Sequence, residues 1–163
     1  MDLSNLQSEL VKYGNLLVEK YKAQLKIDGT YATGDTANSI AYIATRDKLE
    51  IIASNVLEKI DKGTEPGERP KVSSIIKWAE AKSVRPKDGK GRFIKVTDKT
   101  MFWMAKNIAD SIEDVGTIKR FNGAGSGIID FVYQNQKDEM LNNIFAAYGR
   151  DIQETIDEIV KIK

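Results

Sequence analysis

The chain has 163 residues, with 25 Lys plus Arg against 24 Asp plus Glu, and it contains neither Cys nor His. Without these two residue types it can form no disulfide, no thiolate or imidazole metal site, no Cys nucleophile and no Ser-His-Asp triad. Carboxylate-bound Mg²⁺ or Ca²⁺, paired carboxylates, and lysine or tyrosine chemistry are the catalytic classes that survive. We expect a single domain over residues 1–163 that is not an enzyme and needs no cofactor or metal.

The N-terminus and the hydropathy of the chain bear on its location. Met1 is followed by a polar amphipathic stretch, and no apolar run approaches the roughly 18 residues of a membrane span. We therefore expect no signal peptide, no membrane segment and synthesis in a cytoplasm. The formal net charge of +1 is too small to indicate nucleic-acid binding by the chain as a whole.

The first segment predicts a helix from about residue 4 to about residue 27. Its apolar side chains recur at steps of three and four residues, namely Leu3, Leu6, Leu10, Tyr13, Leu17, Tyr21 and Leu25. Ser4 and Gln7 have the spacing of a capping box, and Asp28-Gly29 ends the helix. A helix of this length, about 35 Å, spans its domain or offers part of its length to a partner.

The middle of the chain predicts a β-hairpin and two further helices. Residues 29–39 form a loop, and alternating apolar residues over 40–45 and 49–53 indicate the hairpin. Residues 56–62 fit either a short helix or a third strand. A helix over about 71–82 and a helix from Thr97 or Asp98 to 115 are separated by a brief extended segment over 93–96. Loops rich in proline and glycine, near 63–70 and 83–92, are expected to be flexible.

The last third of the chain begins with a glycine-rich segment, 116–127, which is expected to form a mobile arm or loop. Residues 128–133 are a strand-like apolar run. A final helix then starts near Gln136, with an expected buried side made of Met140, Leu141, Ile144, Phe145, Tyr148, Ile152, Ile156, Ile159 and Val160. The sum is an α+β domain, with about four helices packed on a small antiparallel sheet.

The strongest charge feature lies between residues 82 and 95, where six cations face Asp88 alone, a net charge of +5. These cations could neutralise DNA phosphates, meet an acidic surface on a protein partner, or keep an exposed loop soluble. We treat all six as candidate contacts to a partner or to the DNA backbone: Lys82, Arg85, Lys87, Lys90, Arg92 and Lys95.

Acidic residues gather at the other end, where residues 138–163 have a net charge of −3. The terminal helix carries four of them at helical spacings, and its apolar stripe leaves them on the solvent face. They form a candidate acidic face between subunits: Asp151, Glu154, Asp157 and Glu158. A Mg²⁺ site on the same carboxylates is a weaker alternative.

Three other features have structural interpretations. The stretch 88–92 lacks the first glycine and the Ser or Thr of a phosphate loop. The run 123–127 lacks the strand and helix of a dinucleotide fingerprint and is interpreted as a hinge. Trp78 and Trp103 lie within helical patterns and are expected to pack in the core.

Several short segments form an ordered pattern that follows a long amphipathic helix, precedes a closing helix and extends over nearly the whole chain. They are Thr33-Gly34, Ser39-Ile40, Ile60-Asp61-Lys62-Gly63-Thr64 with Pro66, Ile75-Ile76-Lys77-Trp78-Ala79 with Lys82, and Ala105, Ile108, Ile112 and Gly116. Taken in this order, the segments resemble the head–tail joining or tail-completion ring proteins of tailed double-stranded-DNA phages.

The resemblance implies a structural virion protein without catalysis, located in the neck or tail region and made in the cytoplasm of the host bacterium. Members of this family assemble as closed rings, often six- or twelve-fold, between a portal or connector and the tail. The partners would then be further copies of the chain, portal or connector proteins and tail proteins. The alternative is a DNA-associated virion protein that binds phosphates through residues 82–95.

Overall fold

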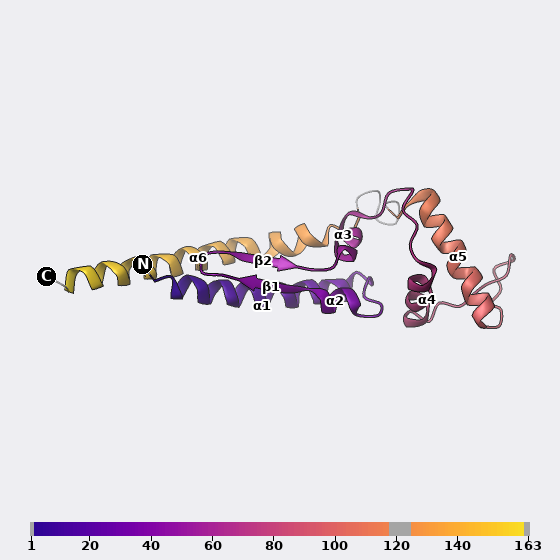
Figure 1. Ribbon diagram of the computed structural model, residues 1–163, viewed down its shortest axis with the longest axis horizontal. Helices are drawn as coiled ribbons and strands as arrows, with labels where there is room; N and C mark the ends of the chain where they lie inside the picture. The colour runs from indigo at the N-terminus through magenta and orange to yellow at the C-terminus, as the bar shows by residue number, and fades with distance from the viewer. Residues whose placement is uncertain (1, 118–124, 162–163) are drawn as a thin grey trace. The chain divides into compact units, whose positions relative to one another are not determined.

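The computed structural model describes residues 2–117 and 125–161 of the chain. Within these residues it has six helices and one two-stranded sheet, in the order α1 (Ser4–Ile27), α2 (Asp35–Ser39), β1 (Ala41–Ala44), β2 (Leu49–Ile52), α3 (Asn55–Lys62), α4 (Val72–Ala81), α5 (Asp98–Val115) and α6 (Ile128–Lys161) (Figure 1). The α+β class, the hairpin and the long terminal helices are confirmed. The expected number of about four helices is wrong, because residues 56–62 are helical and a short helix ends the 29–39 segment.

The chain divides into two compact units. Unit 1 combines Met1–Asp28, Thr36–Ser54 and Ile128–Lys163, and unit 2 combines Gly29–Asp35 and Asn55–Gly127. Unit 1 thus contains both long helices and the hairpin, whereas unit 2 contains α3, α4 and α5. The expectation of a single domain over residues 1–163 stays a prediction.

Unit 1 is built on α1 and α6, which run antiparallel and side by side (Figure 1). Asn143 donates a hydrogen bond of 2.6 Å to the hydroxyl of Tyr13, and the hydroxyl of Tyr21 donates one of 3.3 Å to the carbonyl of Ile129. The predicted apolar stripe of α1 is buried from Leu6 to Leu25. The buried apolar residues of α6 are Ile128, Val132, Met140 and Ala147.

The β-hairpin lies against α1, with Tyr42 opposite Ile51 in the antiparallel register. The side chains of Tyr42 and Ile51 are half-buried, while the neighbouring Ile43 and Ile52 on the other face are exposed. The ring of Tyr42 reaches the backbone of α1 at Gly14, where a Cβ atom would lie only 2.4 Å from the ring. Glycine in the middle of this helix therefore serves the close approach of the hairpin.

Unit 2 packs α4 against α5. The hydroxyl of Thr97 accepts a hydrogen bond from the backbone of Thr100, and the hydroxyl of Thr100 accepts one from the backbone of Thr97, so α5 begins with a capping box. The predicted end of α5 at Gly116 is confirmed, with φ at 67°. The buried residues of α5 are Met101, Ala105 and Ala109.

Two loops of unit 2 are joined through backbone hydrogen bonds to the segment that ends α3. The N–H of Thr117 donates to the carbonyl of Thr64 at 2.7 Å, and the N–H of Gly127 donates to the carbonyl of Asp61 at 3.0 Å. A Cβ atom on Gly125 would lie 2.0 Å from that same Asp61 oxygen, so the contact requires glycine. Residues 118–124, the centre of the expected arm, lie outside the described residues.

The expected extended segment at 93–96 contains no helix, and Phe93 within it pairs with Lys87 through one isolated antiparallel bridge. The strand-like run expected at 128–133 is wrong, because these residues are the first turns of α6, with Ile128 and Val132 buried four residues apart, which is helical spacing. A short apolar run does not by itself distinguish a strand from a buried helix turn.

Candidate interaction surfaces

Residues 82–95, here called the basic hairpin, fold back on themselves in unit 2. Lys87 pairs with Phe93 in an antiparallel bridge, and the N–H of Ile94 donates to the carbonyl of Pro86 at 3.1 Å. At the tip, the N–H of Gly91 donates to the carbonyl of Asp88 at 2.9 Å, and Gly91 has φ at 80°. The proline-glycine loop of the sequence is therefore a tight turn with internal hydrogen bonds.

The carboxylate of Asp88 organises this turn. One of its oxygens accepts hydrogen bonds of 2.9 Å from the N–H groups of both Lys90 and Arg92, and the other accepts from the guanidinium of Arg92 at 2.9 Å. The backbone N–H of Arg92 is the main reason that the pKa of Asp88 lies below its usual value, and burial opposes the effect. Arg92 is consequently engaged inside the hairpin.

All six cations of the basic hairpin are exposed. Phe93 is also exposed, at 61%, and its ring centre lies 5.4 Å from the guanidinium carbon of Arg85 and 4.9 Å from the ammonium of Lys87. The surface therefore combines an apolar ring with flanking positive charge. The charge pattern alone predicts no role for Asp88 or Phe93, although Asp88-Gly89 followed by Gly91 is a recognisable turn pattern.

The four acidic residues predicted on the terminal helix do not share one environment. Glu154, Asp157 and Glu158 are exposed on α6, and the amide of Gln153 donates to Asp157 at 2.8 Å. Asp151 is only 1% exposed, so its predicted place on the solvent face is wrong. The reason is that the N-terminus of α1 lies against it.

Asp151 caps α1 from the far end of the chain. Its oxygens accept hydrogen bonds from the N–H of Asn5 at 3.0 Å, the N–H of Leu6 at 2.9 Å and the side chain of Asn5 at 2.8 Å. Burial raises the pKa of Asp151, but the bonds from Leu6 and Asn5 outweigh burial and the pKa lies below its usual value. The capping box predicted at Ser4 and Gln7 is wrong, since no side chain of α1 caps its own start.

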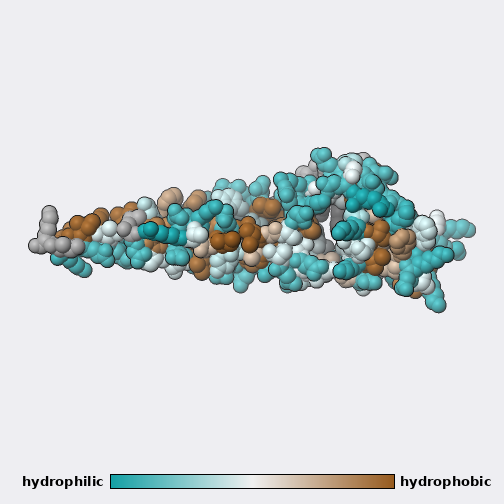
Figure 2. All heavy atoms as spheres, in the orientation of Figure 1, coloured by the Kyte–Doolittle hydropathy of each residue, from teal (hydrophilic) through white to brown (hydrophobic). Residues whose placement is uncertain are grey.

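Most of the predicted buried side of the terminal helix is exposed. Met140 is buried and Ile144 is half-buried, whereas Phe145 is 68%, Ile159 61% and Val160 66% exposed. The other exposed members of the set are Leu141, Tyr148, Ile152 and Ile156. With 34 residues, α6 is longer than α1 with its 24 residues, so α1 cannot cover it completely. Figure 2 shows hydrophobic side chains along the C-terminal part of α6.

The tryptophans differ from expectation as well. Trp78 in α4 is half-buried, but Trp103 in α5 is 51% exposed, so its expected core packing is wrong. The Trp103 ring contacts the neighbouring Phe102 ring edge to face, with centres 5.9 Å apart, and Phe102 is exposed too. The buried side of α5 is formed by smaller residues.

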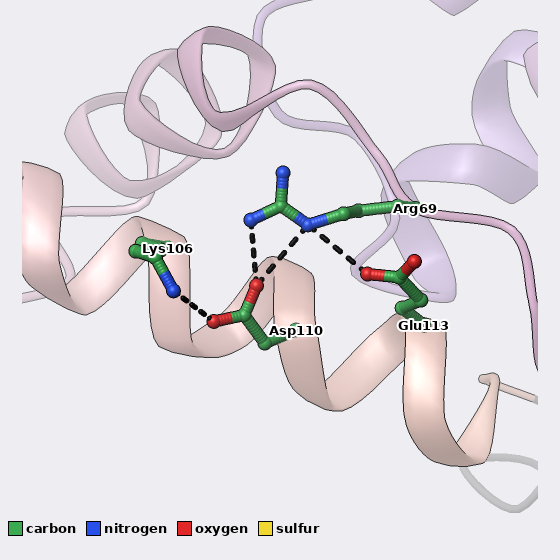
Figure 3. A network of polar contacts seen from close by, with 4 residues as sticks. All are labelled: Arg69, Lys106, Asp110 and Glu113. Atoms are coloured by element: carbon green, nitrogen blue, oxygen red, sulfur yellow. Dashed lines mark hydrogen bonds and ion pairs between the residues drawn. The ribbon is translucent and has the colours of Figure 1, made fainter.

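A polar network ties the 63–70 loop to α5 (Figure 3). Arg69 donates to Asp110 at 2.6 Å and pairs with Glu113 at 3.1 Å, while Lys106 donates to the second oxygen of Asp110 at 2.6 Å. The bond from Lys106, followed by that from Arg69, lowers the pKa of Asp110. The N–H of Gly67 also donates to the carbonyl of Glu113 at 2.7 Å. This loop is thus attached at side chains and backbone.

Comparison with models of protein families, with curated proteins and with solved structures found no match. Among residues 2–117 and 125–161, no three acidic side chains lie close enough together to hold a metal ion. No helix in the described part of the chain has the length and apolar character needed to cross a membrane. The described residues carry two charged surfaces with exposed apolar side chains beside them.

Proposed function

We propose that the chain is a structural virion protein of a tailed phage, a subunit of a neck or tail-completion ring that acts through protein–protein contacts. The observation that carries the proposal is the row of large apolar side chains exposed on α6, from Leu141 to Val160. A contiguous exposed apolar surface beside charged residues is typical of a contact surface. Such a role involves no catalysis and no cofactor.

The residues that resemble the ring family support the proposal because several of them occupy positions that the fold constrains. Gly34 and Gly63 have φ at 86° and 79°, a conformation that favours glycine. Ser39 accepts a hydrogen bond of 3.0 Å from the N–H of Ser54, which joins the two ends of the hairpin segment. A Cβ atom on Gly116 would lie 2.3 Å from the carbonyl of Thr64. These short motifs therefore coincide with positions where the fold restricts the residue type.

The mass and symmetry of the native protein test this proposal. We expect the purified chain, or the chain mixed with portal, connector and tail proteins, to form closed rings, six- or twelve-fold by family resemblance. We also expect antibodies against the chain to label the neck or tail of intact virions. A strictly monomeric protein that binds none of these proteins and is missing from virions would contradict the proposal.

A second candidate function is a DNA-associated virion protein. The observation that favours it is the ordered basic hairpin, which presents Lys87, Lys90 and Lys95 to solvent. Contacts of this kind bind phosphates without reading sequence, and the affinity falls as the salt concentration rises because binding releases counterions. Replacement of all three lysines by Ala should then weaken duplex binding and flatten its salt dependence. Binding that is unchanged by the replacement would exclude this function.

A further inference from the structure

The C-terminal end of α6 extends beyond the start of α1. Asp151 is the α6 residue that caps α1 at Asn5 and Leu6, and α6 continues to Lys161. Residues 152–161, here called the α6 overhang, add about 15 Å of helix at about 1.5 Å per residue. Every residue of the overhang is exposed except Thr155, which is half-buried.

The overhang is amphipathic although only its first turn touches the rest of the described chain, where the side chain of Asn5 donates to Glu154 at 3.2 Å. Ile152, Ile156 and Ile159 follow one another at steps of four and three residues and so line one face. Glu154, Asp157 and Glu158 lie on the opposite side of the helix, and Lys161 is the only basic residue of the overhang. A short helix in water gains little stability without packing. An exposed apolar stripe on a helix with a net negative charge fits a partner surface that has exposed apolar side chains and a net positive charge.

The basic hairpin of this same chain has that chemistry. It presents the exposed ring of Phe93 between Arg85 and Lys87, and Val96 beside it is exposed as well. Its internal hydrogen bonds to Asp88 hold the turn in one conformation, which lowers the ordering cost of binding. A second overhang would be a poorer partner, because it brings the same excess of acidic residues.

We propose that the α6 overhang of one copy binds the basic hairpin of the next copy, with Ile156 and Ile159 against the Phe93 region and the net negative charge of the overhang attracting the lysines. This inference rests on the proposed ring function, since it names the contact between subunits. The two surfaces are different, so the interface is heterologous: each copy uses one surface on each side, and such contacts generate rings or filaments.

Two complementary variants test the proposal. In the hairpin variant, Lys87→Glu and Lys90→Glu reverse exposed charges but leave Asp88 and Arg92 in place. In the overhang variant, Ile156→Glu and Ile159→Glu charge exposed apolar positions. Each variant alone should associate at least about tenfold more weakly than the unaltered chain, because a desolvated contact is lost. Ile27→Glu, at a highly exposed isoleucine of α1, is the matched control and should associate normally.

Mixing the two variants gives the decisive measurement. Each retains the surface that the other has lost, so an equimolar mixture should form one-to-one dimers and nothing larger. Native mass spectrometry with one variant isotopically labelled identifies these dimers, and circular dichroism verifies that both variants are folded. A further variant that adds Asp157→Lys and Glu158→Lys to the two hairpin substitutions should recover part of the lost association, because the net charges of the two surfaces are exchanged.

Three results would overturn the inference: normal association of either variant alone, no dimer in the mixture, or a monomeric unaltered chain at about 100 μM, a concentration at which even weak contacts of ~10⁻⁵ M are populated. None of these results decides the proposed function. Labelling of virions and binding to portal or tail proteins decide that separately, because a ring subunit could contact its neighbours through other surfaces.

Discussion

Unit 1 and unit 2 are stabilised in different ways. Among the described residues, the buried apolar side chains of unit 1 include five leucines and tyrosines of α1 between Leu6 and Tyr21. Those of unit 2 are Leu57, Ala79, Pro86, Met101, Ala105 and Ala109. Small side chains bury little apolar area, and hydrophobic stabilisation scales with that area. Unit 2 has backbone hydrogen bonds between its loops in addition, from Thr117 to Thr64 and from Gly67 to Glu113. Changes to unit 1 should therefore have the larger effects on stability.

Gly14→Ala should give the largest loss. The new Cβ atom would lie 2.4 Å from the ring of Tyr42, so the hairpin must shift away from α1. Overpacking of this kind costs about 1–3 kcal/mol, which exceeds the gain of helix propensity from replacing glycine. Denaturant unfolding followed by circular dichroism measures the change.

Gly149→Ala is the matched control for this prediction. Gly149 lies within α6, and a Cβ atom there would meet nothing within 4 Å beyond its chain neighbours and the backbone of its own helix. The same substitution should therefore stabilise the chain by about 0.5–1 kcal/mol. In a Tyr42→Ala background, Gly14→Ala should no longer destabilise. Equal effects of the two glycine substitutions would contradict the close approach of Tyr42.

Asp151→Ala should give the next largest loss, because it leaves the N–H groups of Asn5 and Leu6 without their acceptor. We expect the thermal midpoint to fall by about 5 °C, with Asp151→Asn intermediate, since an amide has one acceptor oxygen in place of two. Asp157→Asn, at an exposed acid of the same helix, should change the midpoint little. A midpoint that is insensitive to Asp151→Ala would show that this cap does not hold unit 1 together.

The pH dependence of stability should separate Asp151 from its uncharged variant. Because its folded-state pKa is lowered, the carboxylate contributes stability that is fully present above its unfolded value of about 3.9 and is lost as the pH falls through the folded-state pKa. The difference in unfolding free energy between the chain and Asp151→Asn should therefore be constant near pH 7 and shrink below about pH 4. A difference that grows on acidification would have the wrong sign for this mechanism.

The sequence predicts a helix well where a single apolar stripe packs against one neighbouring element of the chain. The three- and four-residue steps of α1, and the cap of α5 at Thr97 with its end at Gly116, are local patterns that tertiary contacts do not override. The strand expected at the start of α6 is wrong because an apolar run as short as 128–133 fits both periods.

The candidate surfaces could be predicted only in part. The charges of the basic hairpin and of Glu154, Asp157 and Glu158 are exposed as expected. The burial of Asp151 could not be inferred, because its partners lie 145 and 146 residues away along the chain. The exposure of Phe145 and Ile159 could not be inferred either. A helix pattern shows which side chains share a face, but it does not show how far the neighbouring helix covers that face.

Arg69→Ala should give the smallest global effect, although it removes the centre of the network in Figure 3. Exposed ion pairs contribute little to stability and are screened by salt, so we expect the thermal midpoint to change by no more than about 2 °C. The local effect should be larger: the 63–70 loop loses its side-chain attachment, and the N–H of Gly67 should exchange with solvent faster. Lys48→Ala removes an isolated exposed pair with Glu50 in unit 1 and should leave the Gly67 exchange rate unchanged. A loss as large as that of Asp151→Ala would mean that unit 2 depends on its surface charges and that the contrast between the two units is wrong.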